Sequence, residues 1–138
     1  PTVQRIVEAT AQPYLQAIYE LASPRLVHGR TVLIGDAAFT ARPHVGLGVS
    51  KAADDARTLA AALAESTPAA LHAWEDARLR YGRAAVQWGR DLGSYIEAPR
   101  DDAAHRGTAD YYRRPEVLLT ETASAEPGPY IAARMLPA

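Results

Sequence analysis

The residues with the clearest chemical potential in this sequence are a carboxylate and two glycines near it along the chain. Asp36 follows the apolar run Thr31–Ile34 and Gly35, and Gly46 and Gly48 precede an alanine-rich segment. A carboxylate at a strand end accepts hydrogen bonds from hydroxyl groups, and the free N–H groups of a helix start attract negative charge. Together they would suit a polyhydroxylated, partly anionic cofactor. Each also has a plainer explanation, because aspartates often bond their own loop and glycines often serve turns.

Two elements must position these groups. The run Thr31–Ile34 has no polar alternation after its first residue, which predicts a strand covered on both faces, as in a parallel sheet. Apolar residues at steps of three and four from Gly48 to Leu63 predict a helix. Its charged side chains, Lys51 and Asp55 among them, are expected to lie mostly off the apolar face.

The N-terminal segment contains two further patterns. Apolar residues at helical spacing predict a short helix over Thr2–Thr10. Aromatic and branched residues over Tyr14–Leu21 predict a strand. Pro24 and Gly29 then bracket a turn.

A long second helix is expected in the C-terminal half. Thr67 is a good N-cap and Pro68 suits the first helical position, while Gly93 or Pro99 should end the helix. Its apolar stripe, in which the two tryptophans are expected to serve core or interface packing, consists of Leu71, Trp74, Tyr81, Ala85, Trp88 and Leu92. The tail beyond Pro99 contains Pro127-Gly128-Pro129 and is expected to be an extended arm or an irregular segment.

Composition narrows the function classes. The chain has 138 residues, of which 48% are hydrophobic and 22% charged, as is ordinary for a globular protein or part of one. A net charge of −1 argues against nucleic-acid and polybasic membrane partners, and no apolar run approaches the roughly 20 residues that span a bilayer. The absence of cysteine is compatible with a reducing cytosol, so a cytoplasmic location is expected. The four histidines lack metal-ligand spacing, so no metal site is expected.

Two other motifs fit this segment poorly. Ser50 with His44 as its base could imitate a hydrolase nucleophile, but that motif needs a strand running directly into the serine. Gly46 and Gly48 do not form a dinucleotide fingerprint, since Lys51 stands where the third glycine belongs.

The combination of motifs resembles a known family. Gly-Asp-Ala-Ala-Phe at 35–39, Arg-Pro-His-Val-Gly at 42–46 and Asp-Asp-Ala-Arg-Thr-Leu-Ala at 54–60 follow the expected strand in order. This order resembles the second flavin-binding motif of the FAD-dependent aromatic hydroxylases, the para-hydroxybenzoate hydroxylase type of flavoprotein monooxygenase. Within this family, the residues of the motif are most similar to those of the 2,6-dihydroxypyridine 3-hydroxylase branch. The resemblance extends from about Gln16 to Leu92.

The resemblance implies roles for individual residues. Asp36 would accept a hydrogen bond from a ribityl hydroxyl of FAD, and Pro43 would line the flavin face where oxygen reacts. Backbone N–H groups at the start of the next helix would face the pyrimidine end of the flavin, where negative charge develops on reduction. These cofactor-binding groups belong to Gly46, Leu47, Gly48 and Val49.

The resemblance specifies the residues that contact the substrate less closely than those that bind the cofactor. His44, next to the catalytic position Pro43, would be a hydrogen-bond partner or acid–base group for a hydroxylated ring, or simply a loop histidine. Tyr19 would line the substrate cavity or be a half-buried strand aromatic. Phe39 and Ser50 stand where many relatives carry histidine and asparagine, but neither change removes a backbone donor.

By resemblance, the fold is α/β: a fragment of a Rossmann-like FAD-binding domain, with its last parallel strand and the following helices. Residues 1–28 would end the substrate domain with a short helix and a strand. Residues 29–98 would be the C-terminal part of the FAD-binding domain. Residues 99–138 would be a helical or irregular tail that could serve as an interface arm, for example in a homodimer.

The implied activity is hydroxylation of an electron-rich hydroxylated aromatic or N-heteroaromatic ring, using FAD, NAD(P)H and O2 through a C4a-hydroperoxyflavin. The sequence begins at Pro1 and contains no Gly-x-Gly-x-x-Gly segment for the ADP part of FAD. We therefore expect a C-terminal piece, active only with an N-terminal segment or partner chain. The alternative is a non-catalytic module that docks onto a flavoprotein through its Trp- and Tyr-bearing helix and tail.

Overall fold

The computed structural model describes residues 2–97 and 106–117. The helices are α1 (Thr2–Ala9), α2 (Gly48–Ala64), α3 (Pro68–Glu97) and α4 (Arg106–Tyr112), with 3-10 turns η1 (Gly35–Ala37) and η2 (Pro43–Val45). The strands are β1 (Leu21–Ala22), β2 (Val27–His28), β3 (Thr31–Val32) and β4 (Phe39–Thr40).

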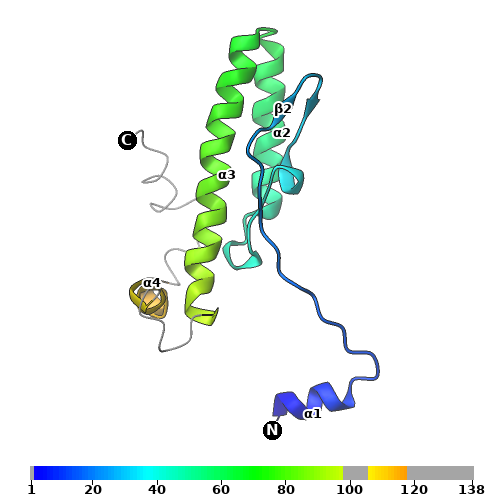
Figure 1. Ribbon diagram of the computed structural model, residues 1–138, viewed down its shortest axis with the longest axis vertical. Coiled ribbons are helices and arrows are strands. Elements are labelled where there is room, and N and C mark those ends of the chain that lie inside the picture. The colour runs from blue at the N-terminus through cyan, green and yellow to red at the C-terminus, as the bar shows by residue number, and fades with distance from the viewer. Residues whose placement is uncertain (1, 98–105, 118–138) are drawn as a thin grey trace.

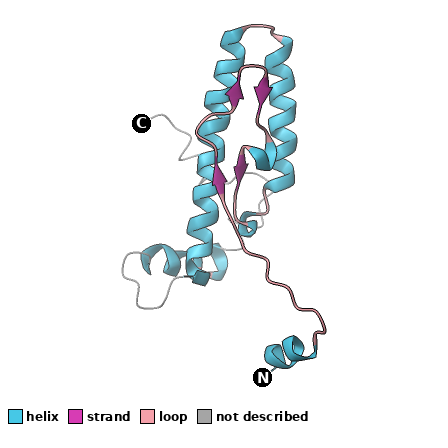
Figure 2. Cartoon of the chain, turned by 45° about the vertical axis from the view of Figure 1, so that its right-hand side comes forward, coloured by secondary structure: helices cyan, strands magenta, loops and turns pink. Residues whose placement is uncertain are grey.

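The body of the molecule is a pair of antiparallel helices with short strands along one side. The helices α2 and α3 run side by side, and the strands run along the same face of this pair (Figures 1 and 2). The strands form two antiparallel ladders, one joining β1 to β4 and the other joining β2 to β3. The helix α1 lies apart from this body, at the end of an extended segment (Figure 1).

Two hydrophobic clusters stack along α3. One is formed by Leu26, Val27, Ala38, Phe39, Ala62, Trp74 and Val86. The other is formed by Val45, Leu47, Ala84, Ala85, Trp88, Leu92, Tyr112 and Val117. Through this second cluster α4 packs against the C-terminal half of α3. The two tryptophans are therefore core residues, and the indole N–H of Trp74 donates to Thr58 Oγ1 at 3.0 Å.

Glycines on α3 allow the segment from Phe39 to His44 to lie directly on the helix. A Cβ built on Gly82 would overlap the Phe39 ring, and one on Gly93 would come within 2.9 Å of the His44 ring. At the position between them, Gly89, a Cβ would come within 3.1 Å of the Arg42 backbone nitrogen. A larger residue at any of these positions would displace the strand-to-loop segment from α3.

A single carboxylate attaches the β2–β3 hairpin to α3. Oε1 of Glu75 accepts the backbone N–H groups of Leu26 at 2.7 Å and Val27 at 2.8 Å. Although partial burial raises the pKa of Glu75, the two N–H donors lower it by more, so this pKa lies below its ordinary value. The hairpin is therefore held by charge-assisted hydrogen bonds.

The helix predictions are confirmed. The short N-terminal helix is α1, and α2 begins at Gly48 as expected. Thr67 caps α3, since its hydroxyl accepts the N–H of Ala70 at 3.1 Å. Gly93 does not end α3, which continues to Glu97. The C-terminal tail contains α4, while residues 98–105 and 118–138 lie outside the described part.

The strand predicted over Tyr14–Leu21 is wrong except at its last residue. The predicted range contributes only its last residue to a strand, β1 (Leu21–Ala22), and no described strand pairs with residues 14–20. Tyr14 and Leu15 are almost fully exposed. Side-chain type favours a strand only where a neighbour supplies hydrogen bonds and an apolar face, and the described residues supply neither to this segment.

The structure confirms a strand within Thr31–Ile34 and shows a pairing that the sequence did not predict. The structure keeps Thr31 and Val32 as strand β3, but its partner is the antiparallel β2, joined by a turn at Gly29 with φ of +61°. A parallel pair requires a second strand that enters by a crossover, and the described residues contain none. The fold remains α/β, with the strand ending at the Gly35–Asp36 turn as the sequence indicates.

Replacing Gly82 by alanine should destabilise the protein by about 1–3 kcal/mol, because overlap with Phe39 outweighs the helix propensity gained. The matched control is Gly107→Ala in α4, where a Cβ meets nothing within 4 Å. Urea unfolding followed by circular dichroism measures both. Equal effects of the two substitutions would contradict this account of α3.

Replacing Glu75 by glutamine should lower the free energy of unfolding at neutral pH by about 1 kcal/mol, since two hydrogen bonds lose their charge. Because the folded-state pKa of Glu75 is lowered, its contribution is complete above the ordinary glutamate pKa of 4.5. The difference between wild type and Glu75→Gln should vanish as pH falls through the lowered pKa. Unfolding curves at several pH values test this, and a difference that does not shrink as the pH falls below 4.5 would refute it.

Candidate functional site

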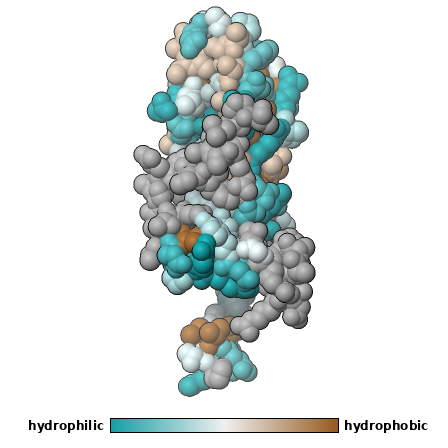
Figure 3. All heavy atoms as spheres, turned by 90° about the vertical axis from the view of Figure 1, so that its left-hand side faces the viewer, coloured by the Kyte–Doolittle hydropathy of each residue, from teal (hydrophilic) through white to brown (hydrophobic). Residues whose placement is uncertain are grey.

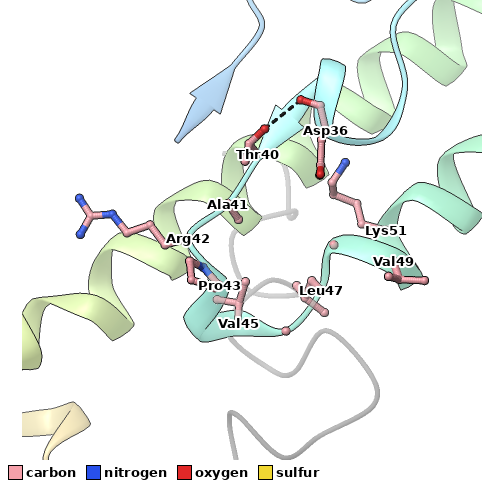
Figure 4. Close-up of a pocket in the computed structure, with 11 residues that line it drawn as sticks. Asp36, Thr40, Ala41, Arg42, Pro43, Val45, Leu47, Val49 and Lys51 are labelled. Carbon is pink, nitrogen blue, oxygen red and sulfur yellow. Dashed lines mark hydrogen bonds between the residues drawn. The ribbon is translucent and has the colours of Figure 1, made fainter. Parts of the chain in front are cut away.

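An open cavity of about 310 Å³ lies where the strand-to-loop segment meets the start of α2 (Figure 4). It is lined by Asp36, Thr40, Ala41, Arg42, Pro43, Val45, Gly46, Leu47, Gly48, Val49 and Lys51. These residues come from η1, β4, η2, the first turn of α2 and the short connections between these elements. One continuous stretch of sequence thus encloses the cavity.

The carboxylate of Asp36 is available to a ligand. Asp36 is exposed and lines the cavity, and its side chain makes no hydrogen bond within the described residues. Its backbone carbonyl accepts the hydroxyl of Thr40 at 2.9 Å, so the local turn is closed by main-chain atoms. The carboxylate is therefore not needed by its own loop.

The start of α2 provides backbone donors on the same cavity. Gly46 adopts the left-handed conformation, with φ of +62°, and ends η2. Leu47, the N-cap, provides no side-chain hydrogen bond. Within the described part of the chain, the N–H groups of Gly48 and Val49 have no acceptor, and Val49 is 87% exposed. This arrangement favours a partly anionic ligand edge.

Behind the cavity lies a buried ion pair formed by two charged residues that the helical pattern predicts off the apolar face. Lys51 and Asp55 are only 3% and 4% exposed, and Lys51 Nζ lies 3.1 Å from Asp55 Oδ2. Nζ also donates to the carbonyl of Gly35 at 2.8 Å, and Oδ2 accepts the Gly35 N–H at 2.9 Å. The spacing of the apolar residues predicts Lys51 and Asp55 off the packed face of α2. Both side chains nevertheless lie on that face, because the Gly35 turn and Arg78 of α3 supply their hydrogen-bonding and charge partners.

The same network continues into α3. Arg78 pairs with Asp55 and donates to Asp54 Oδ2 at 2.8 Å, and its guanidinium lies 4.5 Å from the centre of the Tyr81 ring. A hydrogen bond from Arg57, together with the charge of Arg78, lowers the pKa of Asp54 despite its partial burial. Burial raises the pKa of the Tyr81 hydroxyl. Removing one member of such a buried set leaves an uncompensated charge, which typically costs about 3–5 kcal/mol.

All the expected cofactor-binding residues line the cavity. The structure brings together Asp36, Pro43, Gly46, Leu47, Gly48 and Val49. Two expected substrate residues do not line it: the His44 ring packs against Gly93 of α3, and Tyr19 is 79% exposed in the extended segment before β1. The roles of these residues remain predictions.

Sequence reasoning missed several contributors to the site. Lys51 could have been found from its i,i+4 spacing to Asp55, a helical ion-pair pattern. Glu20 fastens the extended segment by pairing with Arg42 at 3.2 Å and Arg90 at 2.6 Å, and no local pattern indicates these distant partners. In Figure 4 the Arg42 side chain points away from the cavity, so its backbone and stem form the wall.

The described residues contain neither a cluster of metal ligands nor a membrane-spanning helix. Within residues 2–97 and 106–117, no three histidine or acidic side chains come together as metal ligands would. None of the described helices combines the length and apolarity needed to cross a membrane.

Comparison with known proteins assigns the family. The model of the FAD binding domain family matches residues 18–89, which include the cavity and both long helices. The chain belongs to this family.

The relatives are aromatic-ring monooxygenases. The chain is 36% identical over 94 residues to 2,6-dihydroxypyridine 3-monooxygenase of Paenarthrobacter nicotinovorans, covering 67% of this chain and 24% of that enzyme. It is 40% identical over 80 residues to a salicylate hydroxylase of Pseudomonas putida, covering 53% of this chain and 18% of that enzyme. The chain thus spans a quarter or less of the length of these relatives.

A solved structure shares the fold. The structure of 2,6-dihydroxypyridine-3-hydroxylase from Arthrobacter nicotinovorans superposes with a TM-score of 0.56 at 39% identity. The match covers 58% of this chain and 21% of that one. The mixed helix-and-strand arrangement is therefore a fragment of the flavoprotein hydroxylase fold.

Proposed function

We propose that this chain is the flavin-side part of an FAD-dependent monooxygenase that hydroxylates an aromatic ring. The observation that carries the proposal is the cavity, in which an unpartnered carboxylate and free helix-start N–H groups face the same space. Membership of the FAD binding domain family supports the choice of cofactor. Bound FAD, reduced by NAD(P)H, would supply the chemistry with O2.

The residues present fit a flavin. The Asp36 carboxylate would accept a hydrogen bond from a ribityl hydroxyl, while the N–H groups of Gly48 and Val49 would stabilise negative charge at the pyrimidine edge. Pro43, on the cavity wall, would pack against the ring face and exclude water from it. These groups bind and orient the cofactor.

The substrate is proposed to be a small hydroxylated aromatic or N-heteroaromatic ring, such as a dihydroxypyridine. The 36% identity with the dihydroxypyridine enzyme supports this class. His44 follows Pro43 directly and would hold or exchange a proton of a ring hydroxyl if the bound state turned its ring away from Gly93. Tyr19 would reach the substrate from the extended segment. We place the enzyme in the cytoplasm.

The ADP side of the cofactor is proposed to come from further protein, either an N-terminal segment or a partner chain. The relatives are far longer than this chain. The N-terminal part of this chain also exposes apolar side chains, on which further protein would pack. The exposed apolar residues of the N-terminal part are Val3, Ile6, Val7, Tyr14, Leu15, Ile18 and Tyr19. Those on α1 form the hydrophobic patch at the lower end of the molecule in Figure 3. A substrate domain packed on them would complete the enzyme.

The test is a visible absorption spectrum of the protein expressed from its complete reading frame. A yellow protein that is bleached anaerobically by NAD(P)H is the expected result. Asp36→Ala should weaken FAD binding about tenfold or more, since a charge-assisted hydrogen bond is lost. The matched control, Asp76→Ala on the exposed side of α3, should leave FAD binding unchanged.

A colourless protein that stays colourless with added FAD would contradict the proposal. A non-catalytic docking module would then be the better account of the exposed apolar surface. Equal FAD affinity of Asp36→Ala and wild type would keep the enzyme class but remove Asp36 from the site.

A further inference from the structure

We propose that Lys51 is a positioning residue for the cofactor: it aims the Asp36 carboxylate into the cavity by fixing the peptide groups of Gly35. This inference rests on the proposed function, since it assigns the device that orients the FAD-binding carboxylate. Figure 4 shows Lys51 reaching from the first turn of α2 toward the turn that carries Asp36.

Both polar groups of Gly35 are held by the Lys51–Asp55 pair. The ammonium of Lys51 donates to the Gly35 carbonyl at 2.8 Å, and the Asp55 carboxylate accepts the Gly35 N–H at 2.9 Å. The two side chains bind each other at 3.1 Å. Both backbone polar groups of the residue directly before Asp36 are therefore hydrogen-bonded to side chains that lie one helical turn apart on α2.

Gly35 needs these two hydrogen bonds because its backbone conformation is unusual. Its φ is +60°, in the left-handed region that glycine enters freely, and it is buried. A glycine has little intrinsic preference between its allowed regions, so hydrogen bonds must select one. Rotation about the Gly35 backbone would swing the following Asp36 side chain relative to the cavity.

Stability alone does not explain a buried lysine at this position. The Lys51 and Asp55 side chains are 2% and 5% exposed, and burying such a pair gives little or no net stability compared with apolar residues of similar volume. Apolar residues would fill the space but leave the Gly35 N–H and carbonyl without partners. The ion pair satisfies both groups and selects one turn geometry.

Lys51 also lines the cavity, so direct contact with the cofactor is the competing explanation. The two explanations differ in how Lys51 and Asp36 combine. If Lys51 acts only through Asp36, its loss has no further effect once the carboxylate is gone. If Lys51 touches the cofactor itself, the two losses multiply.

The experiment is a double-mutant cycle on FAD affinity in the protein expressed from its complete reading frame. The dissociation constant of FAD is measured by flavin fluorescence for wild type, Lys51→Met, Asp36→Asn and the double variant. Lys51→Met and Asp36→Asn should each weaken binding about tenfold, and the double variant should match Asp36→Asn within about twofold. Arg57→Gln, which removes an exposed ion pair of the same helix, is the control and should bind FAD as wild type does.

A second readout reports on the Gly35 turn without the cofactor. Hydrogen exchange of the peptide spanning Gly35–Phe39 should be faster in Lys51→Met than in wild type or Arg57→Gln. If circular dichroism shows that Lys51→Met does not fold, the cycle is run with Lys51→Gln, which loses the charge but keeps a donor.

Two outcomes overturn the inference while keeping the proposed function. One is a double variant about tenfold weaker than either single variant, which places Lys51 on the cofactor itself. The other is a folded Lys51 variant with wild-type FAD affinity and wild-type exchange at Gly35. A wild-type protein that binds no FAD removes both the proposed function and this inference.

Discussion

The structure depends on a buried set of charges that ties three elements together. Lys51 and Asp55 on α2 hold the Gly35 turn, and Arg78 on α3 joins Asp55 to the same network. Charges inside a protein are tolerated only when they are paired and hydrogen-bonded, so this set admits few alternative arrangements. The relative position of the turn, α2 and α3 follows from it, and so does the shape of the cavity between the turn and the start of α2.

A second constraint acts from the opposite side of the loop. The strand-to-loop segment lies against α3 where Gly82, Gly89 and Gly93 leave room for side chains and backbone. The ionic network sets where the turn begins, and the glycines set how closely the following segment approaches the helix. A cavity made from one continuous stretch can keep its geometry because both ends of that stretch are anchored to the same pair of helices.

The features that the sequence could predict are those encoded locally. The helix α2 has apolar steps of three and four, α3 has a Thr67 cap, and the residues that line the cavity are contiguous. The failures involve partners far away in the chain. Lys51 and Asp55 were expected mostly off the apolar stripe of α2, and their burial is acceptable because Gly35 and Arg78 supply partners for their charges.

Strand pairing was unpredictable for the same reason. Residues 14–20 have strand-forming side chains without a paired neighbour in the described structure, and the pairing of Val32 with Val27 in a hairpin was not predicted. Likewise, no local pattern reveals that Glu75 binds the hairpin backbone or that Glu20 reaches Arg42 and Arg90. Side-chain type indicates the propensity of a segment, while its partners depend on the tertiary fold.

The measurement that tests the central claim most directly is a crystal structure of the protein expressed from its complete reading frame, with FAD bound. The account predicts the Asp36 carboxylate within hydrogen-bond distance of a ribityl hydroxyl and the Gly48 and Val49 N–H groups facing the flavin pyrimidine edge. The Gly35 carbonyl should remain hydrogen-bonded to Lys51, and the Gly35 N–H to Asp55. A flavin bound away from this cavity, or an Asp36 side chain turned to solvent beside a bound flavin, would contradict the account.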